Sequence, residues 1–237
     1  MTQIYTKSFA FFFASLPALL AFAAVIEGLL WVFRPKSEGV VVFGALLIIA
    51  YYFHRHFLFG EGLALGKLKP APDAPPQKFG WFLLISFLMV FVPGGIAVVI
   101  AINATDELGL GILMLTLFPL YLIALGLFGT ALPASVAQDG TYRLSQGLRV
   151  SFPTMGRLIL GPGVVGLVVV AAVLLAGQPL ARLNLAEDSL VLLGWYILIR
   201  TLGFLSTILA VAVLCDMYRR TRPGPVTGLN LPDQRPA

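Results

Sequence analysis

Two ionisable residues lie inside long apolar stretches of this sequence: Glu27 within residues 10–33 and Arg200 within residues 189–217. A charged side chain inside a bilayer is costly, and such residues usually pair with one another or mark a substrate or ion path. We therefore expect Glu27 and Arg200 to form a buried ion pair. Two roles are open for the pair: it fixes the register of two helices, or it is a substrate or proton site.

The two histidines of the chain, His54 and His56, flank Arg55 at the end of another apolar stretch. On a helix their side chains point about 200° apart, so they cannot share one metal ion. No further histidine exists for a haem held between two helices. We expect all three side chains at the membrane interface, with Arg55 reaching toward phosphate headgroups, while Glu61 is an available partner for Arg55 or His54.

Other chemical motifs are missing from the sequence. Its single cysteine, Cys215, allows neither an internal disulfide nor a Cys/His metal site. There is no phosphate-binding glycine loop, zinc signature or GxSxG sequence. We therefore expect no metal, no cofactor and no enzymatic activity.

The composition is that of an integral membrane protein, because 59% of the residues are hydrophobic and only 11% are charged. Six apolar segments are long enough to be membrane helices. They cover residues 10–33, 39–58, 79–103, 110–137, 158–177 and 189–217. The first is too long for the apolar part of a signal peptide, so we expect it to stay as a helix. The predicted fold is an all-α bundle of six transmembrane helices.

The cations predict the orientation of this bundle. With both termini in the cytoplasm, twelve of the 16 Lys and Arg residues fall on the inner side, three fall outside and Arg200 lies within a helix. Such a bias indicates membrane insertion rather than nucleic-acid binding. The basic residues that we expect at the inner interface are His54, Arg55, His56, Arg143, Arg149, Arg157, Arg219 and Arg220.

Proline and glycine interrupt several of these segments. We expect helix breaks at Pro17, Pro93, Gly94, Pro119 and Pro162. Membrane helices tolerate such residues where neighbouring groups satisfy the freed backbone.

The six helices are predicted to form one domain over residues 1–220, followed by a disordered cytoplasmic tail at 221–237. Residues 139–157 are either an amphipathic helix on the inner leaflet or a plain basic loop. Residues 7–17 and 143–153 also resemble each other, with a basic residue followed by Ser-apolar-Pro. This similarity is either a parallel repeat or a chance match.

Three stretches together resemble a group of uncharacterised six-helix bacterial inner-membrane proteins, which is similar to the membrane domain of some glycerophosphodiester phosphodiesterases. They are HRHFLFGEG, the run from GLFGTALPAS to PTMGRLILG, and LCDMYRRTR. The resemblance implies a bacterial inner-membrane location and a link to membrane lipid or to a neighbouring complex. It carries over no catalytic residue, because the chain lacks the metal-binding carboxylates of the phosphodiesterase domain.

The function expected first is therefore a non-enzymatic accessory, assembly or scaffold protein that binds membrane lipids or a membrane protein complex. The main alternative is a small-molecule or lipid transporter with a site at Glu27 and Arg200, and a membrane enzyme comes third. A cavity that reaches this pair favours the transporter, whereas a packed interior favours the accessory role.

Overall fold

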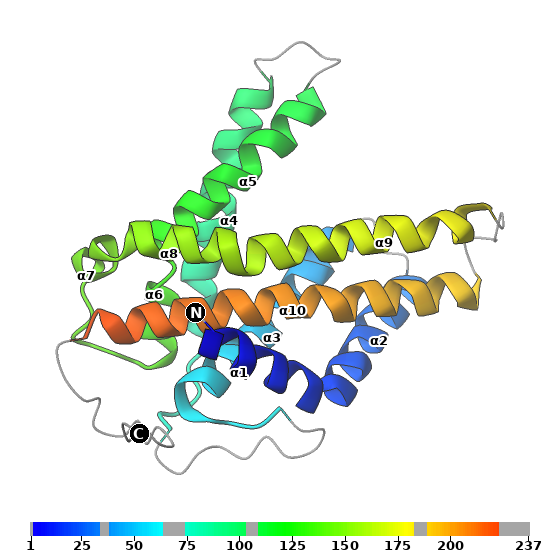
Figure 1. The fold of residues 1–237 in the computed structure, drawn as a ribbon. Coiled ribbons are helices and arrows are strands. Elements are labelled where there is room, and N and C mark those ends of the chain that lie inside the picture. Colours follow the sequence, from blue (N-terminus) through cyan, green and yellow to red (C-terminus); the bar gives the residue numbers. More distant parts are fainter. Residues whose placement is uncertain (1, 34–37, 64–73, 103–108, 183–188, 223–237) are drawn as a thin grey trace. The chain divides into compact units, whose positions relative to one another are not determined.

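The computed structural model describes residues 2–33, 38–63, 74–102, 109–182 and 189–222, and across these ranges it is helical with no strand. The elements are α1 (Thr2–Ala14), α2 (Leu16–Phe33), α3 (Glu38–Phe59), α4 (Gly80–Ile102), α5 (Gly109–Phe128), α6 (Ala131–Val136), α7 (Leu144–Arg149), α8 (Ser151–Leu158), the π-helical segment η1 (Ile159–Gly163), α9 (Val164–Arg182) and α10 (Leu190–Arg220). Figure 1 shows their order along the chain. The predicted tail lies almost wholly outside the described residues.

Within these ranges, five helices are long and apolar enough to cross a membrane, as expected of a multi-pass membrane protein. They cover Leu16–Phe33, Glu38–Phe59, Gly80–Ile100, Ser151–Pro179 and Leu190–Arg220. The chain is therefore all-α, as the composition predicts. A shorter apolar helix covers Thr116–Phe128 within α5.

The predicted segment 110–137 is not one continuous helix, which corrects the sequence-based assignment. The chain turns at Gly129 and Thr130, and α6 follows as a short separate helix. Nearly every residue of α6 is buried, and α6 packs against α4. Its apolar composition therefore reflects burial inside the protein rather than contact with lipid.

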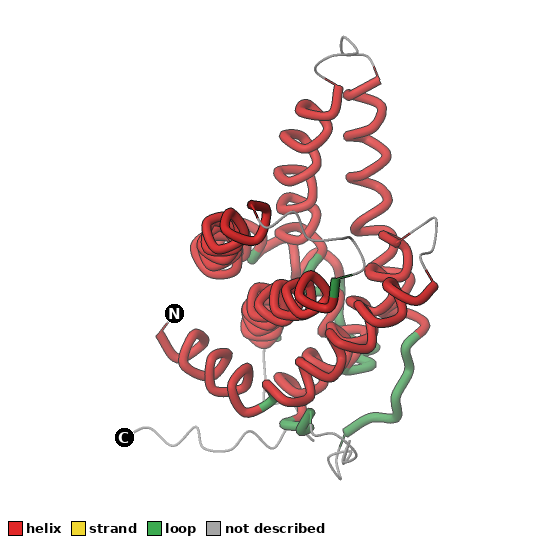
Figure 2. Tube along the Cα trace, turned by 90° about the vertical axis from the view of Figure 1, so that its right-hand side faces the viewer, coloured by secondary structure: helices red, strands yellow, loops and turns green. Residues whose placement is uncertain are grey.

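The described residues divide into two compact units, and the first contains parts of 1–56, 61–70 and 160–212. Here α1 packs on α2, and the first part of α10 lies beside α9 (Figures 1 and 2). The Tyr5 hydroxyl donates to the Leu160 carbonyl at 3.0 Å, and the Ser206 hydroxyl donates to the Pro162 carbonyl at 2.9 Å. These bonds from α1 and α10 satisfy carbonyls of η1, where the regular helical pattern is interrupted.

The second unit contains described parts of 57–60, 71–159 and 213–237. Helices α4 and α5 run side by side, as both views show (Figures 1 and 2), and α8 packs on α5. Two glycines mark close approaches: a Cβ at Gly126 would overlap the Met155 side chain, and a Cβ at Gly129 would overlap the Leu125 carbonyl oxygen and come within 2.6 Å of Leu214. The end of α5 therefore has no room for a side chain at position 129.

The predicted helix breaks have different outcomes. Pro17 is the second residue of α2, directly after the interruption at Ser15, and Pro162 lies in η1. Pro93 and Gly94 lie inside an uninterrupted α4, and Pro119 lies inside α5, so the predicted breaks there are wrong. A proline removes one backbone donor, and a long apolar helix retains enough of its other hydrogen bonds to continue.

The two similar stretches, 7–17 and 143–153, adopt a similar local structure. In each, a short helix stops one residue before the next helix begins, at Ser15 between α1 and α2 and at Val150 between α7 and α8. The same shift of the chain would place α3 over the end of α9 and the start of α10.

Candidate binding site

Glu27 and Arg200, which are far apart in the sequence, form an ion pair in the first unit. Arg200 Nε donates to Glu27 Oε1 at 2.7 Å, and Arg200 Nη2 lies 2.6 Å from the same oxygen. The side chain of Glu27 is 9% exposed and that of Arg200 is 26% exposed. The structure thus brings together the two residues that the sequence singles out, although the guanidinium is only partly buried.

Helices α2 and α10 position the pair because both are apolar along most of their length. Burying Leu19, Ala23 and Ile26 directs the same face of α2, and with it Glu27, toward the protein interior. Thr201, next to Arg200 in the sequence, donates to the Ile197 carbonyl of its own helix at 2.8 Å.

A pocket of about 660 Å³ reaches this ion pair. Its lining comes from α2, α3 and α10, and consists of Glu27, Leu30, Trp31, Glu38, Gly39, Val42, Leu192, Leu193, Tyr196 and Arg200. This volume lies within the range of small-molecule sites in proteins, which are mostly apolar with a few polar groups that orient the ligand. Glu38, which the sequence did not single out, adds a second carboxylate to the lining.

The arrangement suits an amphipathic ligand with a charged end. Among the described residues, no hydrogen bond or ion pair joins Glu27 Oε2 or Arg200 Nη1 to the protein. These atoms can therefore bind donor and acceptor groups of a ligand while the Oε1 contacts remain. The indole of Trp31 and the leucines offer apolar contact to the rest of such a molecule.

The triplet at residues 54–56 is arranged differently from the prediction of an exposed interface. His54 and Arg55 are each 1% exposed, and Arg55 Nε and Nη2 donate to the two carboxylate oxygens of Glu61 at 2.6 Å. His56 stacks on the Phe11 ring at 3.8 Å between centroids. Burial beside Glu61 thus replaces the predicted contact of Arg55 with headgroups, because a fully paired guanidinium can be held inside the protein.

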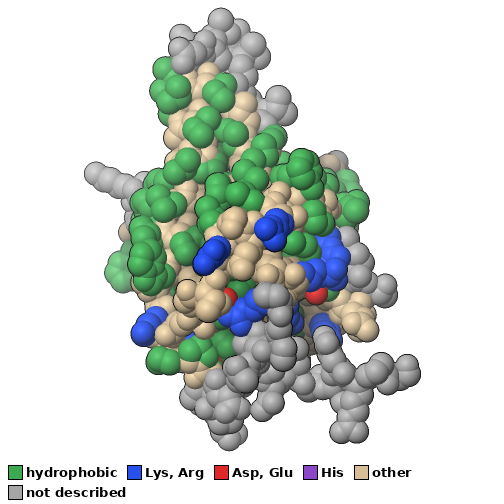
Figure 3. Space-filling model, turned by 90° about the vertical axis from the view of Figure 1, so that its left-hand side faces the viewer, with side chains coloured by type: hydrophobic (Ala, Val, Ile, Leu, Met, Phe, Trp, Pro, Cys, Tyr) green, Lys and Arg blue, Asp and Glu red, His purple; other side chains and the backbone are tan. Residues whose placement is uncertain are grey.

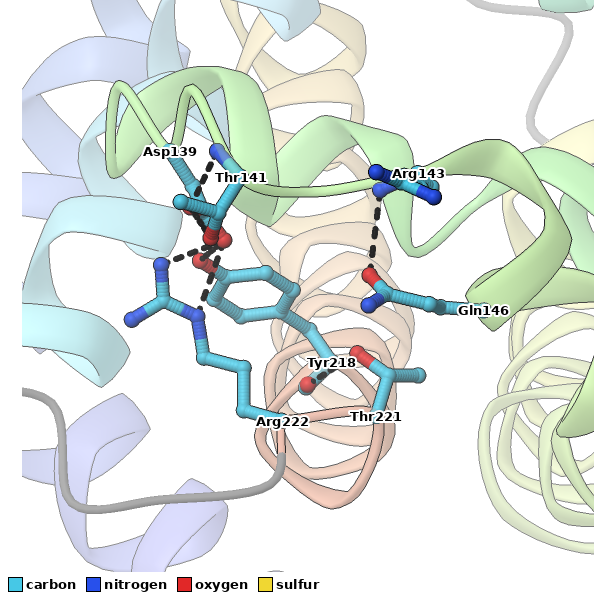
Figure 4. Close-up of polar contacts among 7 residues, drawn as sticks. All are labelled: Asp139, Thr141, Arg143, Gln146, Tyr218, Thr221 and Arg222. Carbon is cyan, nitrogen blue, oxygen red and sulfur yellow. Dashed lines mark hydrogen bonds and ion pairs between the residues drawn. The ribbon is translucent and has the colours of Figure 1, made fainter.

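Asp139, between α6 and α7, is a polar centre that sequence analysis missed (Figure 4). Its carboxylate accepts hydrogen bonds from the Thr141 hydroxyl at 2.6 Å and the Tyr218 hydroxyl at 2.8 Å, and it pairs with Arg222. Burial opposes ionisation of the carboxyl, but the bonds from Arg222, Thr141 and Tyr218 outweigh burial and lower its pKa to about 2. The one hint in the sequence is a lone carboxylate in an otherwise basic connection.

The remaining predicted interface arginines fall into two groups. Arg157 and Arg220 both pair with Asp216, at 2.6 Å and 3.0 Å, and Arg219 donates to the Phe57 carbonyl. Arg143 and Arg149 are exposed, and their side chains have no ion pair with any residue that the structure describes. The prediction that these arginines lie at the membrane interface stays a prediction, and the structure adds protein partners for Arg157, Arg219 and Arg220.

Among the described residues, no three His, Cys, Asp or Glu side chains gather as a metal site would require. In comparisons with known proteins, no family model, no curated protein and no solved structure matches this chain.

Proposed function

We propose that this chain is a membrane protein that binds a small amphipathic molecule at the Glu27–Arg200 pocket and carries it through or along the bilayer. The observation that supports this proposal is the open pocket that reaches the ion pair between α2, α3 and α10. A structural ion pair needs no such space beside it. The transporter or lipid-handling role, second in the sequence analysis, therefore becomes the first, and the accessory role becomes the alternative.

The chemistry of the pocket favours a zwitterionic ligand. Its described lining carries two carboxylates and one guanidinium, together with aromatic and aliphatic side chains. A purely anionic ligand would meet Glu27 and Glu38, and a purely cationic one would meet Arg200. A molecule with an ammonium and an acidic group can bind both kinds of charge, and the Trp31 ring can contact the ammonium through a cation–π interaction.

The proposal includes six membrane spans, with α5 as the sixth, and both termini in the cytoplasm. The cation distribution and the length of α5, 20 residues, support this topology. The resemblance to six-helix bacterial proteins supports an inner-membrane location. In this topology the pocket opens in the outer half of the bilayer, because α2 ends and α3 and α10 begin on the outer side.

The experiment that tests the proposal fills the pocket without touching the ion pair. We would extract the native protein with a lipid-solubilising polymer and identify co-purifying molecules by mass spectrometry. Leu193→Trp fills the pocket, and Leu198→Trp, on the same helix but outside the lining, is the matched control. We expect one zwitterionic species to co-purify with the wild type and with Leu198→Trp. Its amount should be lower by about tenfold or more in Leu193→Trp.

Identical retention by both variants would contradict a ligand site in this pocket. A stoichiometric protein partner, with no ligand that depends on Leu193, would favour the accessory function instead. Transport assays with Glu27→Gln and Arg200→Gln follow only after the ligand is known, because removing one member of the pair leaves an unpaired charge and can disturb folding.

A further inference from the structure

We propose that α7 and the start of α8 form a binding surface for anionic lipid headgroups, made by the guanidinium groups of Arg143 and Arg149 and the exposed side chains of Leu144, Leu148 and Phe152. These five residues are called the α7 surface below. The inference is independent of the Glu27–Arg200 pocket. It assigns lipid contact to Arg143 and Arg149 in particular, rather than to all the basic residues that the sequence predicts at the inner interface.

The two charges of the α7 surface have no ion-pair partner among the described residues. Nearby arginines have carboxylate partners in the protein: Arg157 and Arg220 share Asp216, and Arg222 pairs with Asp139. Arg143 and Arg149 have no such carboxylate among the described residues, and residues 140–158 contain no Asp or Glu. In Figure 4, Arg143 lies apart from the group of side chains around Asp139. Two positive charges therefore remain for an external anion.

The α7 surface also has exposed apolar side chains. Leu144 is 49% exposed, Leu148 is 44% exposed and Phe152 is 82% exposed. Leu144 and Leu148, four residues apart, lie along one side of α7, and Phe152 follows at the start of α8. Exposed leucines and a phenylalanine next to unpaired arginines are typical of a helix at the bilayer surface, where apolar side chains enter the acyl region and cations meet the headgroups.

Protein contacts at Gly147 hold α7 in place. Gly147 is buried, and a Cβ there would overlap the Tyr142 hydroxyl and come within 2.6 Å of Thr130 Oγ1. These two hydroxyls are themselves hydrogen bonded at 2.8 Å. The protein thus occupies the Gly147 side of α7 and leaves the leucines and arginines exposed.

Figure 3 shows Lys and Arg side chains beside hydrophobic ones on the face that it presents. An acidic protein segment would match the charges of Arg143 and Arg149. A lipid would also match the exposed leucines and phenylalanine, because it has acyl chains. The chain also enters its candidate membrane helix directly from this surface, at Ser151. These observations favour anionic lipid as the occupant.

The test compares phosphatidylglycerol with phosphatidylcholine as probes, each titrated into the purified full chain in detergent and counted as bound adducts by native mass spectrometry. The test variant is Arg143→Gln/Arg149→Gln. The control is Lys7→Gln/Lys78→Gln, which removes the same charge from two other exposed cations. We expect the test variant to weaken phosphatidylglycerol binding by about tenfold, since each surface cation typically contributes a severalfold effect. We expect the control to bind nearly as the wild type does.

Phe152→Ser adds a variant without a change of charge, and it should weaken retention of both lipids. Arg143→Lys/Arg149→Lys keeps both charges, so we expect this variant to retain phosphatidylglycerol binding. It also shows whether the loss of binding in Arg143→Gln/Arg149→Gln is due to misfolding. Equal affinity of the wild type for both lipids would overturn the proposal. So would a loss of phosphatidylglycerol binding in Lys7→Gln/Lys78→Gln as large as that in Arg143→Gln/Arg149→Gln. So would a co-purifying acidic protein whose binding, rather than that of phosphatidylglycerol, depends on the two arginines.

Discussion

At the scale of single residues, the charges of this chain separate into paired and unpaired groups. Arg55 and Glu61 are paired and almost fully buried, with side chains that are 1% and 7% exposed. Asp139 is paired through Arg222, with a carboxylate that is 3% exposed. Arg149 is exposed without an ion pair in the described part of the chain. Burial of the Arg55–Glu61 pair and of the Asp139 carboxylate makes these two positions sensitive to a change of one residue, whereas Arg149 should be insensitive.

Glu61→Gln should destabilise the protein by about 3 kcal/mol, because it leaves the buried Arg55 guanidinium without a counter-charge. The free energy of unfolding, measured by denaturant titration in detergent, checks this. Arg149→Gln is the control and should change it by less than about 0.5 kcal/mol. If the two variants lose similar stability, the Arg55–Glu61 pair is not buried as the structure has it.

Asp139→Asn should reduce stability in a way that depends on pH. The fold lowers the pKa of this carboxyl from 3.8 to about 2, so its stabilising effect is complete above pH 4 and is lost as the pH falls toward 2. We expect the wild type to be more stable than the variant by about 2 kcal/mol at neutral pH, with the difference disappearing between pH 4 and 2. A difference that is constant over this interval would rule out ionisation of Asp139 as its cause.

At the scale of elements, the junction between α5 and α6 shows that local sequence favours one helix and that packing interrupts it. The apolar run 110–137 favours one helix, but Gly129 lies against the Leu125 carbonyl and Leu214, and α6 is buried against α4. Proline alone does not end a helix here, since α4 continues through Pro93. Close packing at Gly129, rather than proline content, therefore marks the constrained position.

Gly129→Ala should cost about 1–3 kcal/mol of stability, because the added methyl group needs space that backbone and side-chain atoms already occupy. Gly94→Ala is the matched control, since nothing lies within 4 Å of a Cβ there and alanine is the better helix former. Thermal unfolding of the two variants in the same detergent gives the comparison. Equal transition temperatures would mean that α5 and α10 do not approach as closely as described.

At the scale of the whole molecule, the proposed topology places residues on opposite sides of the membrane. It can be tested on a background without the native thiol, because Cys215 is the single cysteine and is 1% exposed. The charge bias puts Gln77 and Ser145 inside, and Thr105 and Asn184 outside.

Single cysteines introduced at these four positions should react accordingly with a membrane-impermeant maleimide. In intact cells, we expect labelling at positions 105 and 184, and we expect labelling at 77 and 145 only after the membrane is opened. Labelling of 77 and 105 from the same side would show that α4 does not cross the bilayer. Labelling of 105 and 145 from the same side would show that the region of α5 does not form the sixth span.

The sequence by itself determined the helical class, the approximate positions of most membrane helices and the pairing of Glu27 with Arg200. These properties follow from composition, from the length of apolar runs and from the cost of an isolated charge in a bilayer. The first two are local properties of the sequence, and the third leaves few possible partners because few charges lie within the apolar segments. The tertiary structure decided that Arg55 rather than His54 pairs with Glu61 and that this pair is buried. It also decided that Asp139 joins Arg222 and Tyr218, and that a pocket adjoins Glu27. Such contacts depend on which faces of the helices meet, and a hydrophobic pattern that is uniform around a helix does not specify this.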